Sequence, residues 1–143
     1  MKAGHKRLRV VLDTNILVSA LGFSGRIRRI WDLVEENAFD VFLSPFILEE
    51  LERNLIEQVD LTEDKAEVII DVVRNLAQIV EPKTRVTAIP NNNSDNKILE
   101  CAIEAKADLI VTGNMKHIRP LGVYKGIVIM TPREFLDKYF PDI

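Results

Sequence analysis

Short apolar runs alternate with amphipathic stretches along this chain, and this alternation limits its fold more than any other feature. Runs typical of buried strands cover residues 8–12, 40–43, 79–82, 108–112 and 126–130. Stretches with helical periodicity, counted with their caps, cover residues 25–38, 44–59, 62–78, 94–106 and 131–139. Strands that alternate with helices are typical of α/β proteins with a parallel sheet. The sequence therefore predicts an open parallel sheet with helices on both faces.

Local signals mark where several of these helices begin. Ser44 is a favoured N-cap, and Pro45 is favoured at the first helical position. Ser94 is the expected cap of the 94–106 helix. The 62–78 helix opens at Thr62, and its periodicity predicts a set of inward-facing apolar residues: Val68, Ile69, Val72, Val73 and Leu76.

The size and composition of the chain fit a single globular domain over residues 1–143. Hydrophobic residues make up 47% and charged residues 29% of the sequence, which excludes a disordered or fibrous protein. The one cysteine, Cys101, cannot form an internal disulfide, and no apolar stretch is long enough to span a bilayer. We therefore expect a cytoplasmic protein that does not contact membranes.

The net charge of −3 argues against a protein that coats nucleic acid without specificity, because such binding depends on neutralising many phosphates. The charge does not exclude an enzyme that meets nucleic acid at one local site. An excess of acid is also what a metal-binding cluster produces before its metal is counted.

Asp13 directly follows the first apolar run. In open parallel sheets the ligand crevice lies beyond the carboxyl ends of the strands, so Asp13, Thr14 and Asn15 are expected at its mouth. The alternative is a plain strand-to-helix turn, where these residue types are common N-caps. The residues alone do not decide between these two interpretations.

Asp95 stands on the apolar face of the 94–106 helix, in line with Ile98, Leu99, Ala102 and Ile103. An unpaired carboxylate on a buried face is costly, and a metal ion is one reason for its presence. The alternative is that Asp95 simply complements the helix dipole in the first turn.

Other polar residues give weaker signals. Glu49 and Glu50 flank the buried side of the 44–59 helix at similar angles, so periodicity does not choose between them. Thr112 and Asn114 end another strand, where they either hold a metal-bound water or form a turn. Oxygen donors without Cys or His clusters favour Mg²⁺ or Mn²⁺, ions that polarise a phosphodiester and activate water.

These residues resemble the motifs of the PIN-domain nucleases, many of which are ribonuclease toxins of the virulence-associated protein C type from toxin–antitoxin pairs. The resemblance runs from Arg9 to Phe140 and rests on three segments in order, residues 11–15 (VLDTN), 43–51 (LSPFILEEL) and 95–114. It implies a three-layer α/β/α fold around a central, mostly parallel sheet of four to five strands.

The resemblance maps the family's catalytic, metal-binding acids onto Asp13, Glu50 and Asp95, with Asn114 at the fourth metal position. Glu50 is chosen over Glu49 because the family places its glutamate before a leucine. The fourth position is often Asp, so Asn114 removes one charge and a second metal is expected to bind less well. The supporting polar residues by this mapping are Asn15, Ser44 and Thr112.

Basic residues near the predicted crevice are candidates for contact with RNA phosphates. They are Arg26, Arg28 and Arg29, after the first turn, and Lys116, after the fourth metal position. The alternative for each is a solvated surface position. His117 and Arg119, which follow Lys116, are further candidates for phosphate contact, although a lone histidine here is more often a turn or surface residue than a metal ligand.

The leading hypothesis is a metal-dependent endoribonuclease, with a role as the toxin of a toxin–antitoxin pair, an antitoxin protein as partner and a homodimeric assembly. The alternative is a catalytically weak PIN-fold module that binds RNA or protein, motivated by Asn114 and by the asparagines at 91–93. A receiver-like phosphotransfer domain fits less well, because no phospho-acceptor strand end lies between the first strand and Val111-Thr112.

Overall fold

The computed structural model describes residues 7–23 and 25–141, and its centre is one six-stranded sheet with the order β3-β2-β1-β4-β6-β5. The strands are β1 (Arg9–Leu12), β2 (Asp40–Leu43), β3 (Gln78–Ile79), β4 (Leu109–Val111), β5 (Val123–Tyr124) and β6 (Ile127–Met130). All neighbours pair in parallel except β5 and β6. The predicted α/β class and mostly parallel sheet are confirmed. The sequence did not predict the sixth strand, β5, because it has only two residues and lies at the edge of the sheet.

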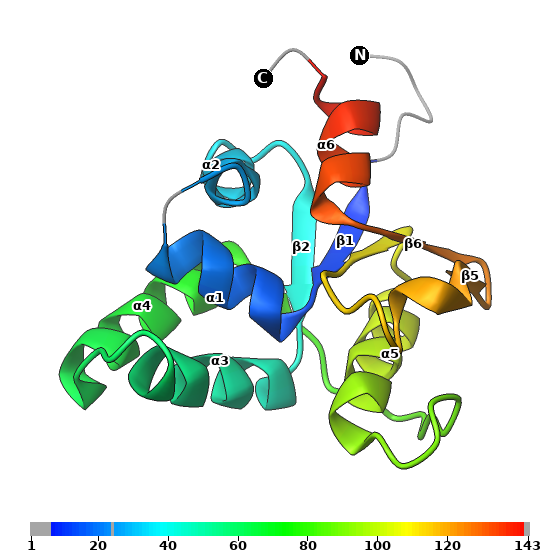
Figure 1. The fold of residues 1–143 in the computed structure, drawn as a ribbon, viewed down its shortest axis with the longest axis horizontal. Coiled ribbons are helices and arrows are strands. Elements are labelled where there is room, and N and C mark those ends of the chain that lie inside the picture. Colours follow the sequence, from blue (N-terminus) through cyan, green and yellow to red (C-terminus); the bar gives the residue numbers. More distant parts are fainter. Residues whose placement is uncertain (1–6, 24, 142–143) are drawn as a thin grey trace.

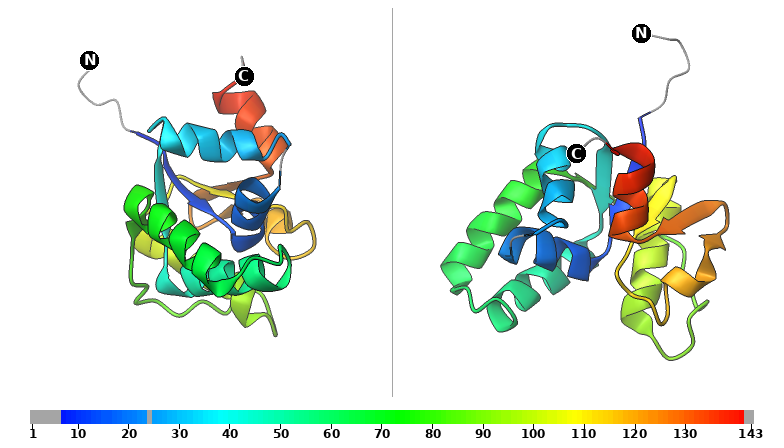
Figure 2. Two further views of the ribbon diagram at one scale, coloured as in Figure 1. Left: turned by 90° about the vertical axis from the view of Figure 1, so that its left-hand side faces the viewer. Right: turned by 45° about the horizontal axis from the view of Figure 1, so that its top comes forward.

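Helices cover both faces of this sheet, as predicted (Figures 1 and 2). Helices α1 (Thr14–Gly22), α2 (Arg28–Glu35), α3 (Pro45–Glu57) and α4 (Glu63–Leu76) gather on one side, and α5 (Asn93–Ala105) lies on the other. The last helix, α6 (Pro132–Tyr139), packs against β6, with the ring of Phe135 edge-on to that of Phe39 at 5.3 Å. Among the described residues, no helix is long and apolar enough to cross a membrane.

Helix α1 is an element that periodicity did not reveal. Its apolar residues occur on nearly all sides of the helix, so no single stripe stands out along the sequence. Five of its nine residues are buried: Thr14, Ile16, Leu17, Val18 and Ala20. The side chain of Asp13 caps this helix by accepting a hydrogen bond from the backbone N–H of Ile16 at 3.0 Å. Asp13 is therefore an N-cap and, at the same time, the residue at the end of β1.

The predicted inward face of α4 is correct at Val73, which is buried, and at Ile69, which packs partly buried against the core, but it is wrong at the other three positions. Its N-cap is Thr62, as expected, but the buried residues are Ala66, Ile70 and Val73. Three residues predicted to face inward are instead exposed on one stripe: Val68 at 63%, Val72 at 45% and Leu76 at 40%. The apolar run from 68 to 73 fits more than one face of a helix, and packing against α3 decides which one is buried.

The predicted helix starts are confirmed at Ser44 and corrected at Ser94. Ser44 accepts a hydrogen bond from the N–H of Ile47 at 3.3 Å, with Pro45 following it at the start of α3. Helix α5 begins two residues earlier than expected, because Asn92 rather than Ser94 is the cap and accepts from the N–H of Asp95 at 3.2 Å. This shift leaves Ser94 in the first helical turn.

The register of the central strands positions the site. Strands β1 and β4 are neighbours, with Leu12 opposite Val111. Because both strands run in the same direction, the residues that follow them emerge at the same edge of the sheet. Asp13 and Thr112 therefore lie side by side, although 99 positions separate them along the chain.

Candidate active site

A pocket of about 130 Å³ opens at the carboxyl ends of β1 and β4. Its walls come from β1 and α1, from α3, from the start of α5 and from the turn after β4. The lining residues are Asp13, Thr14, Asn15, Glu50, Ser94, Asp95, Ile98, Asn114 and Ile118. The structure thus brings the three predicted acids, Asn114 and Asn15 to one pocket. Their chemical roles stay predictions.

Asp13 is the most deeply placed of the acids, with only 4% of its surface exposed. Its Oδ1 accepts from the backbone of Ile16, and its Oδ2 accepts from the hydroxyl of Thr112. Burial raises the pKa of Asp13, the hydrogen bonds from Thr112, Ile16 and Gly113 lower it, and the nearby charge of Asp95 adds to the rise. A cation placed beside such a carboxylate would favour its charged form.

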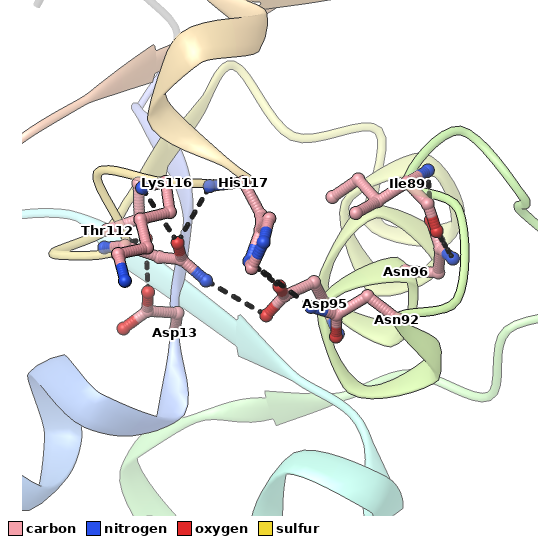
Figure 3. Close-up of polar contacts among 9 residues, drawn as sticks. Asp13, Ile89, Asn92, Asp95, Asn96, Thr112, Lys116 and His117 are labelled. Atoms are coloured by element: carbon pink, nitrogen blue, oxygen red, sulfur yellow. Dashed lines mark hydrogen bonds and ion pairs between the residues drawn. The ribbon is translucent and has the colours of Figure 1, made fainter.

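Asn114 connects the end of β4 to Asp95. Its backbone N–H donates to Oγ1 of Thr112 at 2.9 Å, and its side-chain Nδ2 donates to Oδ1 of Asp95 at 3.0 Å. Its Oδ1 accepts from the backbone N–H groups of Lys116 at 3.2 Å and His117 at 2.9 Å (Figure 3). The amide therefore presents its nitrogen to the acid and its oxygen to its own turn.

The second oxygen of Asp95 is the unsatisfied atom of the pocket. Within the described part of the chain, Oδ2 of Asp95 is one of two buried side-chain N or O atoms with no hydrogen-bond partner. Nδ1 of His117 lies 3.2 Å away and forms an ion pair only when the imidazole is protonated. The same nitrogen lies 3.2 Å from Nδ2 of Asn92, a donor that needs Nδ1 unprotonated. One protonation state of His117 cannot satisfy both neighbours.

Glu50 lines the pocket but is turned along its own helix. Its carboxylate pairs with Arg53 one turn later, and its side chain is 18% exposed. Glu49, which periodicity could not distinguish from it, is exposed and lines a separate hollow beside Arg74. Across residues 7–23 and 25–141, no three His, Cys, Asp or Glu side chains already stand together as metal ligands. Glu50 would have to leave Arg53 to join the two aspartates.

The four basic residues predicted to contact RNA differ in their surroundings. Arg26 pairs with Asp137 at 2.6 Å, Arg28 with Asp32 at 3.5 Å and Arg29 with Glu36 at 3.1 Å. None of these three arginines lines the pocket. Lys116 is exposed in the turn after Asn114. Of the four, only Lys116 is joined by a hydrogen bond to a residue that lines the pocket, Asn114.

Ser44 stands apart from the other predicted supporting residues. It does not line the pocket, and its hydroxyl caps α3 and faces the thiol of Cys101. Thr112 does not line the pocket either, but its hydroxyl reaches Asp13 directly. Ser44 thus serves the scaffold, whereas Thr112 acts on the site.

The sequence did not point to Asn92 or Asn96 as site residues, and it offered His117 only as a candidate phosphate contact. Asn96 holds the preceding loop by pairing both of its side-chain ends with the backbone of Ile89, at 2.9 and 2.8 Å. That loop carries Asn92, the cap of α5, whose amide reaches His117 (Figure 3). The three-residue spacing from Asn92 to Asp95 was a signal for the cap. No local signal placed His117 beside Asp95.

Comparison with known proteins identifies the class to which this fold and pocket belong. The family model described as PIN domain matches residues 9–116. The chain therefore belongs to the PIN domain family, a family of nucleases. It is also similar to the uncharacterized protein MJ1680 of Methanocaldococcus jannaschii, at 29% identity over 93% of this chain and 92% of that protein.

Solved structures share the fold at low sequence identity. VapBC-1 from nontypeable Haemophilus influenzae superposes with a TM-score of 0.62 and 16% identity, over 88% of this chain and 99% of that chain. VapBC2 from Rickettsia felis, solved with a DNA fragment from its promoter, superposes with a TM-score of 0.61 and 17% identity, over 85% of this chain and 97% of that chain. FitAcB from Neisseria gonorrhoeae superposes with a TM-score of 0.58 and 18% identity, over 87% of this chain and 98% of that chain. These likenesses establish the fold alone.

Proposed function

We propose that the chain is a metal-dependent endoribonuclease that uses Mg²⁺ or Mn²⁺ to hydrolyse RNA phosphodiester bonds. The observation that carries this proposal is the meeting of Asp13, Glu50 and Asp95 in one pocket, from three separate elements. Nuclease chemistry follows from membership in the PIN domain family. The choice of RNA rests on the resemblance to the ribonuclease toxins.

The donors in the pocket fit a hard divalent cation. Oδ2 of Asp95 is buried without a hydrogen-bond donor, and the carboxylate of Asp13 is held in a desolvated position. All candidate ligands are oxygens, which Mg²⁺ and Mn²⁺ prefer. Asp13 and Asp95 would hold the ion, joined by Glu50 once it leaves Arg53. When bound, such an ion polarises a phosphodiester and lowers the pKa of an attacking water.

The chain's own residues supply orientation and substrate contact. Thr112 fixes Asp13 through Oδ2, and Asn15 and Ser94 offer polar groups on the pocket wall. Lys116 is placed to attract a phosphate at the mouth. Arg26, Arg28 and Arg29 would contact RNA further along, after exchanging their carboxylate partners for phosphates. With a net charge of −3, RNA affinity is expected to be modest and salt-sensitive.

The test is cleavage of single-stranded and structured RNA in the presence of Mn²⁺ or Mg²⁺. Wild type is expected to cleave only with metal, and Asp13→Asn is expected to lose cleavage by at least about 100-fold, because loss of even an outer-shell partner of a metal ligand costs up to about 100-fold. Asp71→Asn is the matched control, because it makes the same change at an exposed position on α4. Cleavage that persists in Asp13→Asn, or that continues when a chelator removes the metal, would contradict the mechanism.

We also propose that the chain works as the toxin of a toxin–antitoxin pair in the cytoplasm and forms a homodimer. The neighbours VapBC-1 and VapBC2 bear the name of the type that the sequence motifs resemble. An antitoxin segment would cover the acidic pocket. Growth arrest on expression, relieved by the cognate antitoxin, supports the toxin role. Light scattering that finds only monomer would contradict the proposed homodimer.

The second candidate is a catalytically weak domain that binds RNA or a protein on the same scaffold. It is favoured by Asn114 and by the ion pair that turns Glu50 toward Arg53. Calorimetry separates the two candidates: absence of Mg²⁺ and Mn²⁺ binding at millimolar concentration favours the binding module.

A further inference from the structure

We infer that Asn114 is a positioning residue rather than a metal ligand, and that the pocket consequently binds one divalent cation. The inference rests on the proposed function for the existence of a cation site. It concerns how many ions the pocket holds and what Asn114 contributes. The argument starts from the direction in which the side-chain amide points.

The oxygen of Asn114 is committed to its own turn. It accepts from two backbone N–H groups, those of Lys116 at 3.2 Å and His117 at 2.9 Å. Backbone N–H groups only donate, so the atom that faces them must be an acceptor. The other end of the amide is then the NH₂ group, which points at Oδ1 of Asp95 at 3.0 Å. Turning the amide over would lose two hydrogen bonds and set an oxygen against a carboxylate.

This direction leaves no lone pair of Asn114 facing the pocket. An amide can ligate a hard cation only through its oxygen, because the planar nitrogen has no available lone pair. The carboxylates that line the pocket are those of Asp13, Glu50 and Asp95. Three carboxylates neutralise one divalent ion, whereas two adjacent ions bring four positive charges and would leave the pocket with a net positive charge.

The same geometry explains what an asparagine achieves at this position. An aspartate in the same turn would accept from Lys116 and His117 with one oxygen and place its other oxygen about 3 Å from Asp95. Two carboxylates that close repel unless a proton or cation lies between them. Asn114 replaces that repulsion with a hydrogen bond, so Asp95 is held in position before any ion binds.

Asn114 also reaches Asp13. Its backbone N–H donates to Oγ1 of Thr112, and the hydroxyl of Thr112 donates to Oδ2 of Asp13. One residue is thereby linked to both aspartates, through its side chain on one side and its backbone on the other. Substitution of the side chain should release Asp95 while leaving the link to Asp13 intact.

The experiment counts Mn²⁺ ions on the full chain by calorimetry and by the electron paramagnetic resonance signal of free Mn²⁺. Wild type is expected to bind one ion. Asn114→Asp is expected to gain a second ion, because it adds an oxygen donor and a charge. Asn114→Ala is expected to keep one ion at about 10-fold lower affinity, the low end for loss of a supporting hydrogen bond. Asn75→Asp, which adds the same charge at an exposed position on α4, should match wild type.

Melting temperatures recorded beside the titrations separate positioning from folding, since a merely structural role would change Tm without changing ion affinity. Two ions on the wild type, or unchanged affinity in Asn114→Ala, would overturn the inference while the proposed nuclease function stands. One ion on Asn114→Asp with unaltered affinity would overturn it as well. A wild-type chain that binds no Mn²⁺ contradicts the proposed function itself, and the inference with it.

Discussion

The hydroxyl of Thr112, just past the end of β4, donates a hydrogen bond to Oδ2 of Asp13, just past the end of β1. Thr112 is fully buried and Asp13 nearly so, so neither group can exchange this bond for one with bulk water. Because Leu12 and Val111 are paired in the parallel register of the two strands, the two residues must emerge together. The central sheet thus orients the acid on which the proposed site depends.

Replacement of Thr112 tests this link. Thr112→Val keeps the shape of the side chain but removes the donor, so Oδ2 of Asp13 loses its partner in a buried position. We expect a loss of stability of about 1–3 kcal/mol, the usual cost of an unsatisfied buried group, measured by urea unfolding. Thr112→Ser retains the hydroxyl and should stay close to wild type. Equal losses in the two variants would show that packing, not the hydrogen bond, is responsible.

In the metal-free chain at neutral pH, the charged side chain of Asp13 is expected to lower the free energy of unfolding. Burial raises the pKa of Asp13 above its ordinary value of 3.8, so the folded chain holds the proton more tightly than the unfolded chain. Its contribution is therefore most favourable below pH 3.8 and is lost as pH rises through the pKa of the folded protein.

Asp13→Asn should consequently raise the stability of the metal-free chain at pH 7 by about 1 kcal/mol, while it abolishes metal binding. Differential scanning calorimetry in a chelating buffer measures the first effect. In saturating Mn²⁺ the order should reverse, because only wild type gains the free energy of ion binding. A variant that is less stable than wild type in both buffers would contradict this account of Asp13.

The ion pair between Arg53 and Glu50 is expected to compete with the metal. Arg53→Ala should strengthen Mn²⁺ binding by up to about fivefold, since exposed ion pairs contribute at most about 1 kcal/mol. Arg74→Ala removes the same charge from α4, outside the pocket, and controls for the change in net charge. Equal Mn²⁺ affinities for Arg53→Ala and Arg74→Ala would mean that Glu50 does not have to leave Arg53 to bind the ion.

Cys101 is expected to be inert in the folded chain. It is fully buried in α5, and burial raises the pKa of its thiol to about 12 from 9.0. The reactive thiolate is then on the order of 1000-fold rarer than in the unfolded chain at the same pH. A thiol-reactive dye at pH 8 should label the chain quickly in concentrated urea and very slowly in its absence. Rapid labelling of native protein would contradict the packing of α5 on the sheet.

The sequence by itself determined the parts of this protein that depend on neighbouring residues. Apolar runs predicted the main strands, and cap residues at Ser44 and Thr62 predicted two helix starts, because strand burial and N-caps leave local patterns. Placing Asp13 at the end of a strand was enough to expect it at the ligand edge of a parallel sheet. The motif resemblance then grouped it with Glu50 and Asp95, which the structure brings to the same pocket.

Tertiary structure decided whatever depends on partners from distant positions. Packing against α3 chose the buried face of α4 and left Val68, Val72 and Leu76 exposed, a choice that the apolar run alone did not contain. Arg53 determined the direction of Glu50. The amide of Asn114 took its direction from backbone donors on one side and Asp95 on the other. Hydrogen bonds are directional, so the identity of a residue cannot reveal which of its atoms faces the site until its partners are in place.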